Sequence, residues 1–187
     1  KEVKRANTYL EEKVAELELA ADAHDRLTRQ LSRGGSLQEM AEVIADMLRG
    51  EVAFVDPAGR ELCVAAPHGF EARGATGRTP PATRIDPTVL LASEKSRSTG
   101  RSVPLPTEDG EAASGRIVAV SGGEDLLGSL VIRTEQPLSD HEIRIFERGS
   151  TAMAVLALLA EKEYASERED ANLTVRALLD ESGPESK

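Results

Sequence analysis

A long proline-free stretch near the C-terminal end restricts the fold more than any other feature of the sequence. From Ser139 to Glu181 there is no proline, and Gly149 is the only glycine. The stretch predicts one helix of roughly 40 residues, about 60 Å long at the rise of an α-helix. A domain built from this chain is about 35 Å wide. We therefore expect the helix to project beyond its domain and to present an apolar stripe to a partner helix.

The two halves of this predicted helix differ in character. The first half is apolar nearly all round, which predicts burial. The second half is charged but keeps a stripe at heptad-like spacing. The stripe consists of Met153, Ala157, Ala160, Tyr164, Ala171, Val175 and Leu178. We expect Met153, Leu156 and Tyr164 to contact a second copy of the chain.

Residues 2–31 predict another long helix, since they contain neither proline nor glycine. A heptad pattern places Val3, Leu10, Leu17, His24 and Leu31 at d, and Asn7, Val14, Ala21 and Thr28 at a. A lone Asn at an a position fixes the register and favours a two-stranded parallel coiled coil. We expect a homodimer with Asn7, Leu10, Val14 and Leu17 in its interface. Because His24 interrupts the seam, an amphipathic helix packed on its own domain is the alternative.

Between the long helices the sequence predicts an α+β domain. Ser36 and Glu39 form a capping box before a helix at 37–49, and Ser139 and Glu142 form a second one. A turn at 56–59 joins the first two strands. The predicted strands are 51–55, 61–65, 101–105, 116–120 and 126–133, with a long loop at 67–85, a short helix at 86–95 and a polar loop at 106–114. Hairpins with helices at both ends indicate an antiparallel sheet flanked by helices.

One stretch carries a family resemblance. It runs Gly128-Ser-Leu-Val-Ile-Arg133, then Gln136-Pro-Leu-Ser-Asp-His-Glu-Ile143, then Phe146 through Ala160. It resembles the end of a GAF domain, where a last strand opening on glycine leads into an L-S/T-x-x-E/D helix start and an Ala/Leu-rich helix. Residues 36–66 resemble the first helix and hairpin of that family. The resemblance implies a GAF-like domain at 35–160, between a coiled-coil helix at 1–34 and a signalling helix at 161–187.

The flanking motifs narrow the resemblance. They are His24-Asp-Arg-Leu-Thr-Arg29, Gly35-Ser-Leu-Gln-Glu39 and Val55-Asp-Pro-Ala-Gly-Arg60. They resemble actinobacterial transcriptional regulators of the PucR/CdaR type. This implies a non-enzymatic sensory module whose DNA-binding helix-turn-helix lies outside these residues, and the lack of an initiating Met predicts a piece of a longer protein. A GAF module of a two-component kinase or phosphatase signalling protein is the alternative.

The charge of the chain restricts its partners. With 33 acidic and 23 basic residues, the formal net charge is −10. Such a chain lacks the positive charge that binds nucleic acid or an anionic membrane. The longest apolar run, Ala152 to Ala160, is shorter than the roughly 20 residues that span a bilayer. We therefore expect that these residues bind neither a membrane nor DNA. A single cysteine permits no internal disulfide, so we also expect a cytoplasmic protein.

No set of residues predicts catalysis. The three histidines are scattered and no zinc spacing, phosphate-binding loop or nucleophile elbow is present. We expect no metal, no cofactor and no enzymatic activity. Cys63 is expected to be a buried core residue; the alternative is a redox centre. The resemblance adds that sulfoxide-reducing GAF domains need more than one cysteine, and that the bilin and cyclic-nucleotide signatures of the family are absent.

Four residues are candidates for binding a small anionic metabolite. His68 opens the long loop, and three arginines lie near the ends of predicted elements around it: Arg84, Arg101 and Arg116. A guanidinium fork matches the geometry of a carboxylate. We expect the ligand between the sheet, the 67–86 loop and the 86–95 helix. The alternative for each residue is a solvent-exposed side chain without a ligand.

Overall fold

The computed structural model describes residues 2–67, 87–105 and 114–181. Most of the two predicted loops, 67–85 and 106–114, therefore lies outside the described residues. In chain order the elements are α1 (Glu2–Ser32), α2 (Leu37–Leu48), β1 (Glu51–Val55), β2 (Glu61–Ala65), α3 (Pro87–Thr99), β3 (Val103–Pro104), β4 (Gly115–Gly122), β5 (Asp125–Arg133) and α4 (Asp140–Glu181). Within these residues no helix is both apolar enough and long enough to span a membrane.

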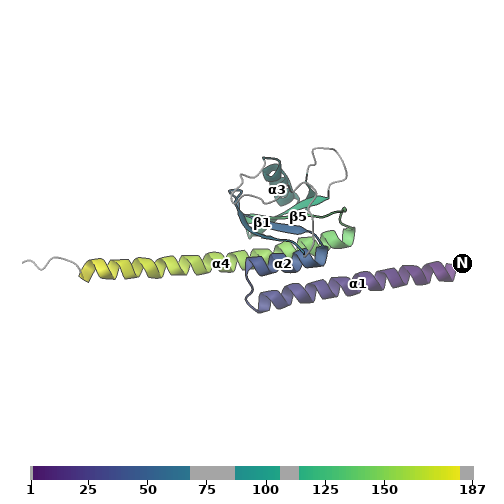
Figure 1. Ribbon diagram of the computed structural model, residues 1–187, viewed down its shortest axis with the longest axis horizontal. Coiled ribbons are helices and arrows are strands. Elements are labelled where there is room, and N and C mark those ends of the chain that lie inside the picture. The colour runs from purple at the N-terminus through teal and green to yellow at the C-terminus, as the bar shows by residue number, and fades with distance from the viewer. Residues whose placement is uncertain (1, 68–86, 106–113, 182–187) are drawn as a thin grey trace, which may run out of the picture.

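The five strands form one antiparallel sheet in the order β2-β1-β5-β4-β3 (Figure 1). Both predicted hairpins are confirmed, since β1 pairs with β2 and β4 pairs with β5. β5 also pairs with β1, which joins the hairpins at the centre of the sheet. The predicted strand at 101–105 is only two residues long, and the Leu105 N–H after it still donates to the Gly115 carbonyl at 2.9 Å.

Helices cover the two faces of the sheet unequally. α1, α2 and α4 lie on one face and α3 lies on the other (Figure 1). The larger core, under the three helices, is centred on side chains that are 0% exposed: Met40, Ile44, Phe54, Phe146 and Met153. The smaller core, under α3, contains Ala53, Val55, Ala92, Val103, Leu105, Ile117 and Val131. Burial of these apolar side chains is the main contribution to the stability of the fold.

Both predicted capping boxes are confirmed. The Glu39 N–H donates to Ser36 Oγ at 3.2 Å, and the Ser36 N–H donates to Glu39 Oε2 at 2.8 Å. At the start of α4, the Glu142 N–H donates to Ser139 Oγ at 3.3 Å and the Ser139 N–H donates to Glu142 Oε2 at 2.8 Å. Each box satisfies two backbone donors that have no partner within the helix.

The turn between β1 and β2 has the predicted form. The Gly59 N–H donates to the Asp56 carbonyl at 2.9 Å, which closes a four-residue turn with Pro57 in its second position. Asp56 also accepts the Arg60 N–H at 2.8 Å and forms an ion pair with the Arg60 guanidinium at 2.7 Å. Burial opposes ionisation of Asp56, but these bonds to Arg60 hold its pKa below the ordinary value.

Gly149, the single glycine of α4, marks the place where α2 crosses that helix. A Cβ on Gly149 would lie 2.8 Å from Ile44 Cδ1. Ile44 is 0% exposed, so the missing side chain lets α2 approach α4 closely. The glycine therefore serves helix packing and does not interrupt α4.

The long helices α1 and α4 extend from the domain at opposite ends (Figure 1). They contact each other on the same side of the sheet and run in the same direction, α1 projecting at its N-terminal end and α4 at its C-terminal end. The first half of α4 was predicted to be buried. This prediction is wrong for one side of the helix, which is exposed. Val155, Leu158 and Leu159 are 43%, 44% and 50% exposed, because the sheet and α2 cover only the opposite side.

Candidate functional site

Two of the four predicted ligand-binding residues meet at the edge of the sheet. Arg101 follows α3 and directly precedes Ser102, and Arg116 lies on β4 and binds Ser102. Arg116 Nε donates to Ser102 Oγ at 3.2 Å, and Arg116 Nη2 donates to the Ser102 carbonyl at 2.9 Å. His68 and Arg84 lie outside the described residues. At this edge, Arg116 thus connects β4 to the segment of Arg101 and Ser102 that follows α3.

The centre of this edge cluster is Glu147 of α4, which the sequence did not single out. Its Oε1 accepts the Ser102 N–H at 2.9 Å and the Ser102 hydroxyl at 3.1 Å. Its Oε2 pairs with Arg101 Nη1 at 3.1 Å. The Glu147 side chain is 17% exposed. Arg101, Ser102, Arg116 and Glu147 form the edge cluster. Its hydrogen bonds and ion pair connect α4 to the turn between α3 and β3.

The pKa values of Glu147 and Arg116 are shifted within the cluster. Burial opposes ionisation of Glu147, but the Ser102 N–H and hydroxyl and the Arg101 guanidinium together lower its pKa. Burial also lowers the pKa of Arg116, while the negative charges of Glu147 and Asp140 act in the opposite direction. The carboxylate at the centre is thus held in its charged form by donors from the α3–β3 turn.

We expect Glu147→Gln to lower the free energy of unfolding by about 1–3 kcal/mol at neutral pH, since the amide loses charge-assisted hydrogen bonds. Folding lowers the pKa of Glu147, so its contribution is complete above the ordinary value of 4.5 and is lost as the pH falls through the folded value. The difference between the two proteins should therefore shrink in acid. Urea unfolding at several pH values measures it.

The control for this measurement is Glu161→Gln, which changes an exposed carboxylate on the same helix. It should alter stability by less than about 0.5 kcal/mol at every pH. A Glu147→Gln difference that stays constant on acidification would contradict the role assigned to the ionised carboxylate.

A hollow of about 810 Å³ lies beside the edge cluster, between the end of α3, the outer edge of β4 and α4. Its size suits a small molecule. The Ser96 hydroxyl, which lines it, accepts the Ala119 N–H at 2.9 Å and donates to the Arg101 carbonyl at 2.7 Å. β3 is too short to pair with Ala119, so the Ser96 hydroxyl accepts the backbone N–H that a neighbouring strand would otherwise bind. The carboxylates of Glu124, Asp125 and Glu147 also line the hollow, which makes it a poor place for an anion.

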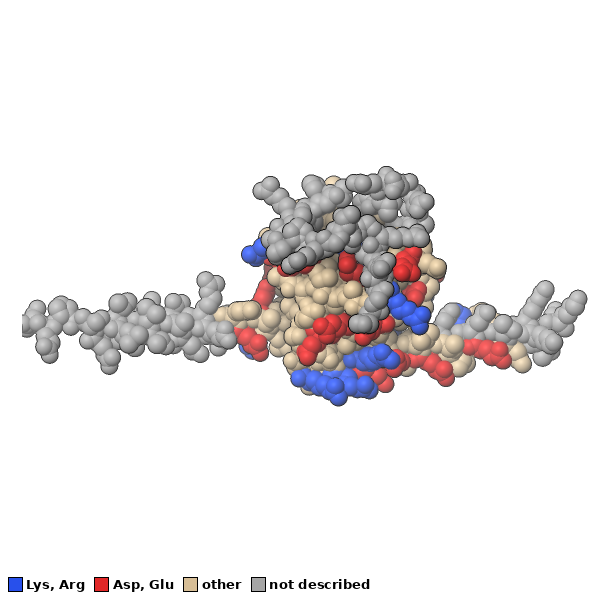
Figure 2. All heavy atoms as spheres, in the orientation of Figure 1, with Lys and Arg blue, Asp and Glu red and all other residues tan. Residues whose placement is uncertain are grey.

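Basic side chains gather instead at the C-terminal end of α1 (Figure 2). Arg26, Arg29 and Arg33 line a small hollow of about 190 Å³ together with Asp46 of α2. Arg26 pairs with Asp22 at 2.8 Å. These arginines lie on the side of α1 next to α2, away from α4.

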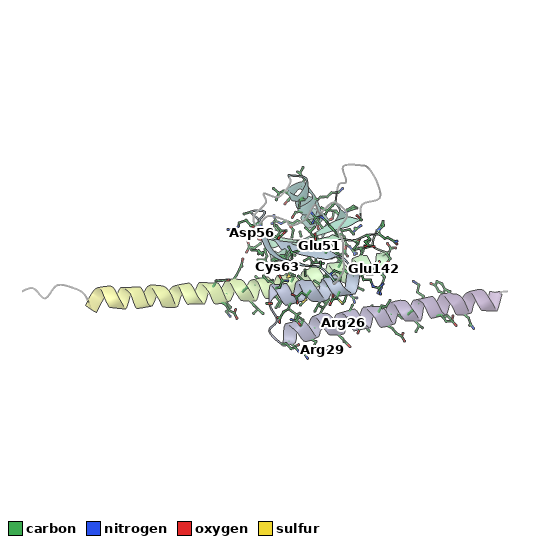
Figure 3. The ribbon with its side chains drawn as sticks, viewed as in Figure 1. Arg26, Arg29, Glu51, Asp56, Cys63 and Glu142 are labelled. Atoms are coloured by element: carbon green, nitrogen blue, oxygen red, sulfur yellow. The ribbon has the colours of Figure 1, made fainter. Side chains whose placement is uncertain are left out.

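Cys63 lies on β2, on the side of the sheet that faces the larger core (Figure 3). It is 9% exposed, and burial raises the pKa of its thiol to about 11. The expectation of a buried core residue is confirmed. Within the described residues, no group of three or more His, Cys, Asp and Glu side chains could hold a metal ion.

We expect Cys63 to react slowly with thiol reagents in the folded protein. At pH 7, a thiol with a pKa of about 11 is ionised in only about one molecule in ten thousand, and the thiolate is the reactive form. Absorbance during labelling with an aromatic disulfide should rise slowly in buffer and quickly in denaturant. Equally fast labelling in both conditions would contradict this assignment.

The residues predicted to form a dimer interface fall into two groups. Five are exposed: Asn7, Leu10, Val14 and Leu17 on α1, and Tyr164 on α4. Met153 and Leu156 are 0% and 4% exposed and lie in the core of their own chain. Their assignment to a partner surface is therefore corrected. The apolar stripe through them packs on the sheet, because α4 lies across that face before it projects.

Solved structures with a similar fold are GAF domains. The GAF domain of a phosphoenolpyruvate-protein phosphotransferase from Coxiella burnetii has a TM-score of 0.56 at 10% identity, over 80% of this chain and 98% of that chain. The corresponding Acinetobacter domain has a TM-score of 0.51 at 11% identity, over 76% and 95%. The cofactor-binding GAF domain of the nutrient sensor CodY from Clostridium difficile has a TM-score of 0.46 at 16% identity, over 72% and 95%. No family model and no curated protein sequence matches the chain. The chain has the GAF fold, as the sequence predicts.

Proposed function

We propose that this chain is a non-enzymatic sensory and dimerisation module of a bacterial transcriptional regulator in the cytoplasm. One observation carries the proposal. α1 and α4 pack together on one face of a GAF-fold domain, run in the same direction and leave it at opposite ends (Figure 1). The domain thus lies between the projecting ends of two long helices. A conformational change within the domain can therefore alter the position of one helix relative to the other.

The edge cluster supports such a relay. α3 and α4 lie on opposite faces of the sheet (Figure 1). Ser96 of α3 binds the Arg101 carbonyl, and the neighbouring Ser102 binds Glu147 of α4. A ligand bound on the α3 side would therefore act on α4 through this turn, provided that it prefers one setting of the helices.

The ligand of this proposal is a small anionic metabolite that binds on the α3 side of the sheet, outside the apolar core that α3 covers and away from the hollow lined by carboxylates. The output is a DNA-binding helix-turn-helix after Lys187, as in the PucR/CdaR-type regulators that the sequence resembles. The residues encoded after Lys187 test this part directly. A helix-turn-helix there supports it, whereas an ATPase or phosphatase motif would assign the module to a kinase or phosphatase signalling protein.

Thermal unfolding with a panel of carboxylate and phosphate metabolites tests the sensory part. A ligand present at a hundred times its Kd should raise Tm by about 5–10 °C for a chain of this length. The neutral amide of an active carboxylate is the matched control and should give no shift. If no member of the panel raises Tm, the proposal of an anionic ligand is wrong.

A further inference from the structure

α3 packs on the sheet through small side chains. Among its described side chains, from residue 89 to residue 99, the buried ones are Ala92, Ser93 and Ser96. The two leucines of the helix, Leu90 and Leu91, are 47% and 73% exposed. Because burial stabilises in proportion to the apolar area that is removed from water, α3 gains little from its contact with the sheet.

α2 provides the comparison within the same domain. It has 12 residues, against 13 in α3. Its buried side chains include three large apolar ones, Met40, Ile44 and Leu48. No described residue of α3 belongs to the larger core, which lies on the other face of the sheet (Figure 1). Burial therefore holds α2 in place much more strongly than it holds α3, although the helices are almost equally long.

Hydroxyl groups make the other buried contacts of α3. The Ser93 and Ser129 hydroxyls form a hydrogen bond of 2.6 Å between α3 and β5. The Ser96 hydroxyl accepts the Ala119 N–H at 2.9 Å and donates to the Arg101 carbonyl at 2.7 Å. When the helix leaves the sheet, water replaces each of these partners, so the net stabilisation from each bond is modest.

We propose that α3 detaches from the sheet as one unit while the rest of the domain stays folded, and that its attached and detached states form a switch. A segment with few buried apolar contacts opens at a lower free energy than the whole domain. The larger core remains intact when α3 leaves, since α3 contributes nothing to it among the described residues.

The edge cluster links this switch to α4. In the attached state Ser96 holds the Arg101 carbonyl, and the next residue, Ser102, binds Glu147 of α4. Detachment of α3 removes the first of these bonds and loosens the segment that carries the second. A ligand that binds one of the two states more tightly shifts their populations. This role rests on the proposed function, whereas detachment itself needs no ligand.

Hydrogen exchange of the full chain without ligand, resolved by residue with NMR, tests the detachment. We expect protection factors in the middle of α3 to share one value, at least about a hundredfold below those of α2. Ser96→Ala leaves the Ala119 N–H and the Arg101 carbonyl without their partner in the attached state. It should therefore lower the protection of α3 by a further factor of about five or more and leave α2 unchanged.

Ser98→Ala is the matched control for this variant. Ser98 is exposed, and its hydroxyl donates to the Lys95 carbonyl within α3 itself. The same substitution there should change the protection of α3 by less than about twofold, because it removes no contact with the sheet.

Each outcome of the exchange experiment supports or overturns part of the inference. Protection of α3 equal to that of α2, or protection that only falls gradually toward the helix ends, would overturn detachment as a unit. So would an equal loss of protection in both helices of Ser96→Ala. Faster exchange of the Ser102 N–H in Ser96→Ala supports the link to α4, and an unchanged rate would overturn the switch. A chain without a ligand or a DNA-binding domain would still show the detachment, so failure of the proposed function is distinguishable.

Discussion

Leu17→Glu should convert the dimer into monomers. Leu17 is 70% exposed in the single chain and lies on the seam, so the dimer would bury two copies of it. Loss of two buried leucines, each worth about 1.5–3 kcal/mol, weakens association at least about a hundredfold. The two glutamates add repulsion at the same place. Sedimentation velocity across a concentration series measures the change.

Leu19→Glu is the matched control for this variant. Leu19 is 57% exposed, and two residues along a helix place it on the other side of α1 from Leu17. The same chemical change should therefore leave the dimer intact. Equal dissociation by the two variants would show that the seam is not the contact surface.

Gly128→Ala should have the largest effect on folding. The β-carbon of an alanine there would collide with the backbone carbonyl of Val55 and lie 2.9 Å from two ring carbons of Phe54. Phe54 is 0% exposed and Val55 belongs to β1, which is paired with a strand on each side, so neither can yield without moving the sheet. We expect a loss of about 3 kcal/mol or more, measured by urea unfolding.

Gly123→Ala separates this steric effect from backbone strain. Gly123 has φ +69° in the β4–β5 turn, and a Cβ there would meet nothing within 4 Å. The substitution should cost about 1–2 kcal/mol through strain alone. A Gly128→Ala protein as stable as the Gly123→Ala protein would contradict the close packing of β5 on β1.

Local signals in the sequence predicted the elements of the fold well. Both capping boxes and both hairpins are confirmed, because each depends on residues a few positions apart. The main errors in element bounds are at β3, which is two residues long, and at α3, which continues to Thr99. The GAF resemblance supplied the overall fold, since strand order depends on contacts between distant residues.

The sites were harder to predict for the same reason. Glu147 and Ser102 are 45 positions apart in the sequence, and no local pattern connects them. Met153 and Leu156 were assigned to a partner because an apolar stripe has the same spacing whether it faces a sheet or another helix. Only the structure shows which stripe its own domain covers.

Native mass spectrometry of the purified chain is the most direct test of the central claim, a dimeric sensory module. At tens of micromolar we expect a mass of two chains of 20.0 kDa each. A reproducible added mass would also weigh a retained ligand. A mass of one chain at every concentration would contradict the dimer, and with it the mechanism by which α4 passes on the state of the domain.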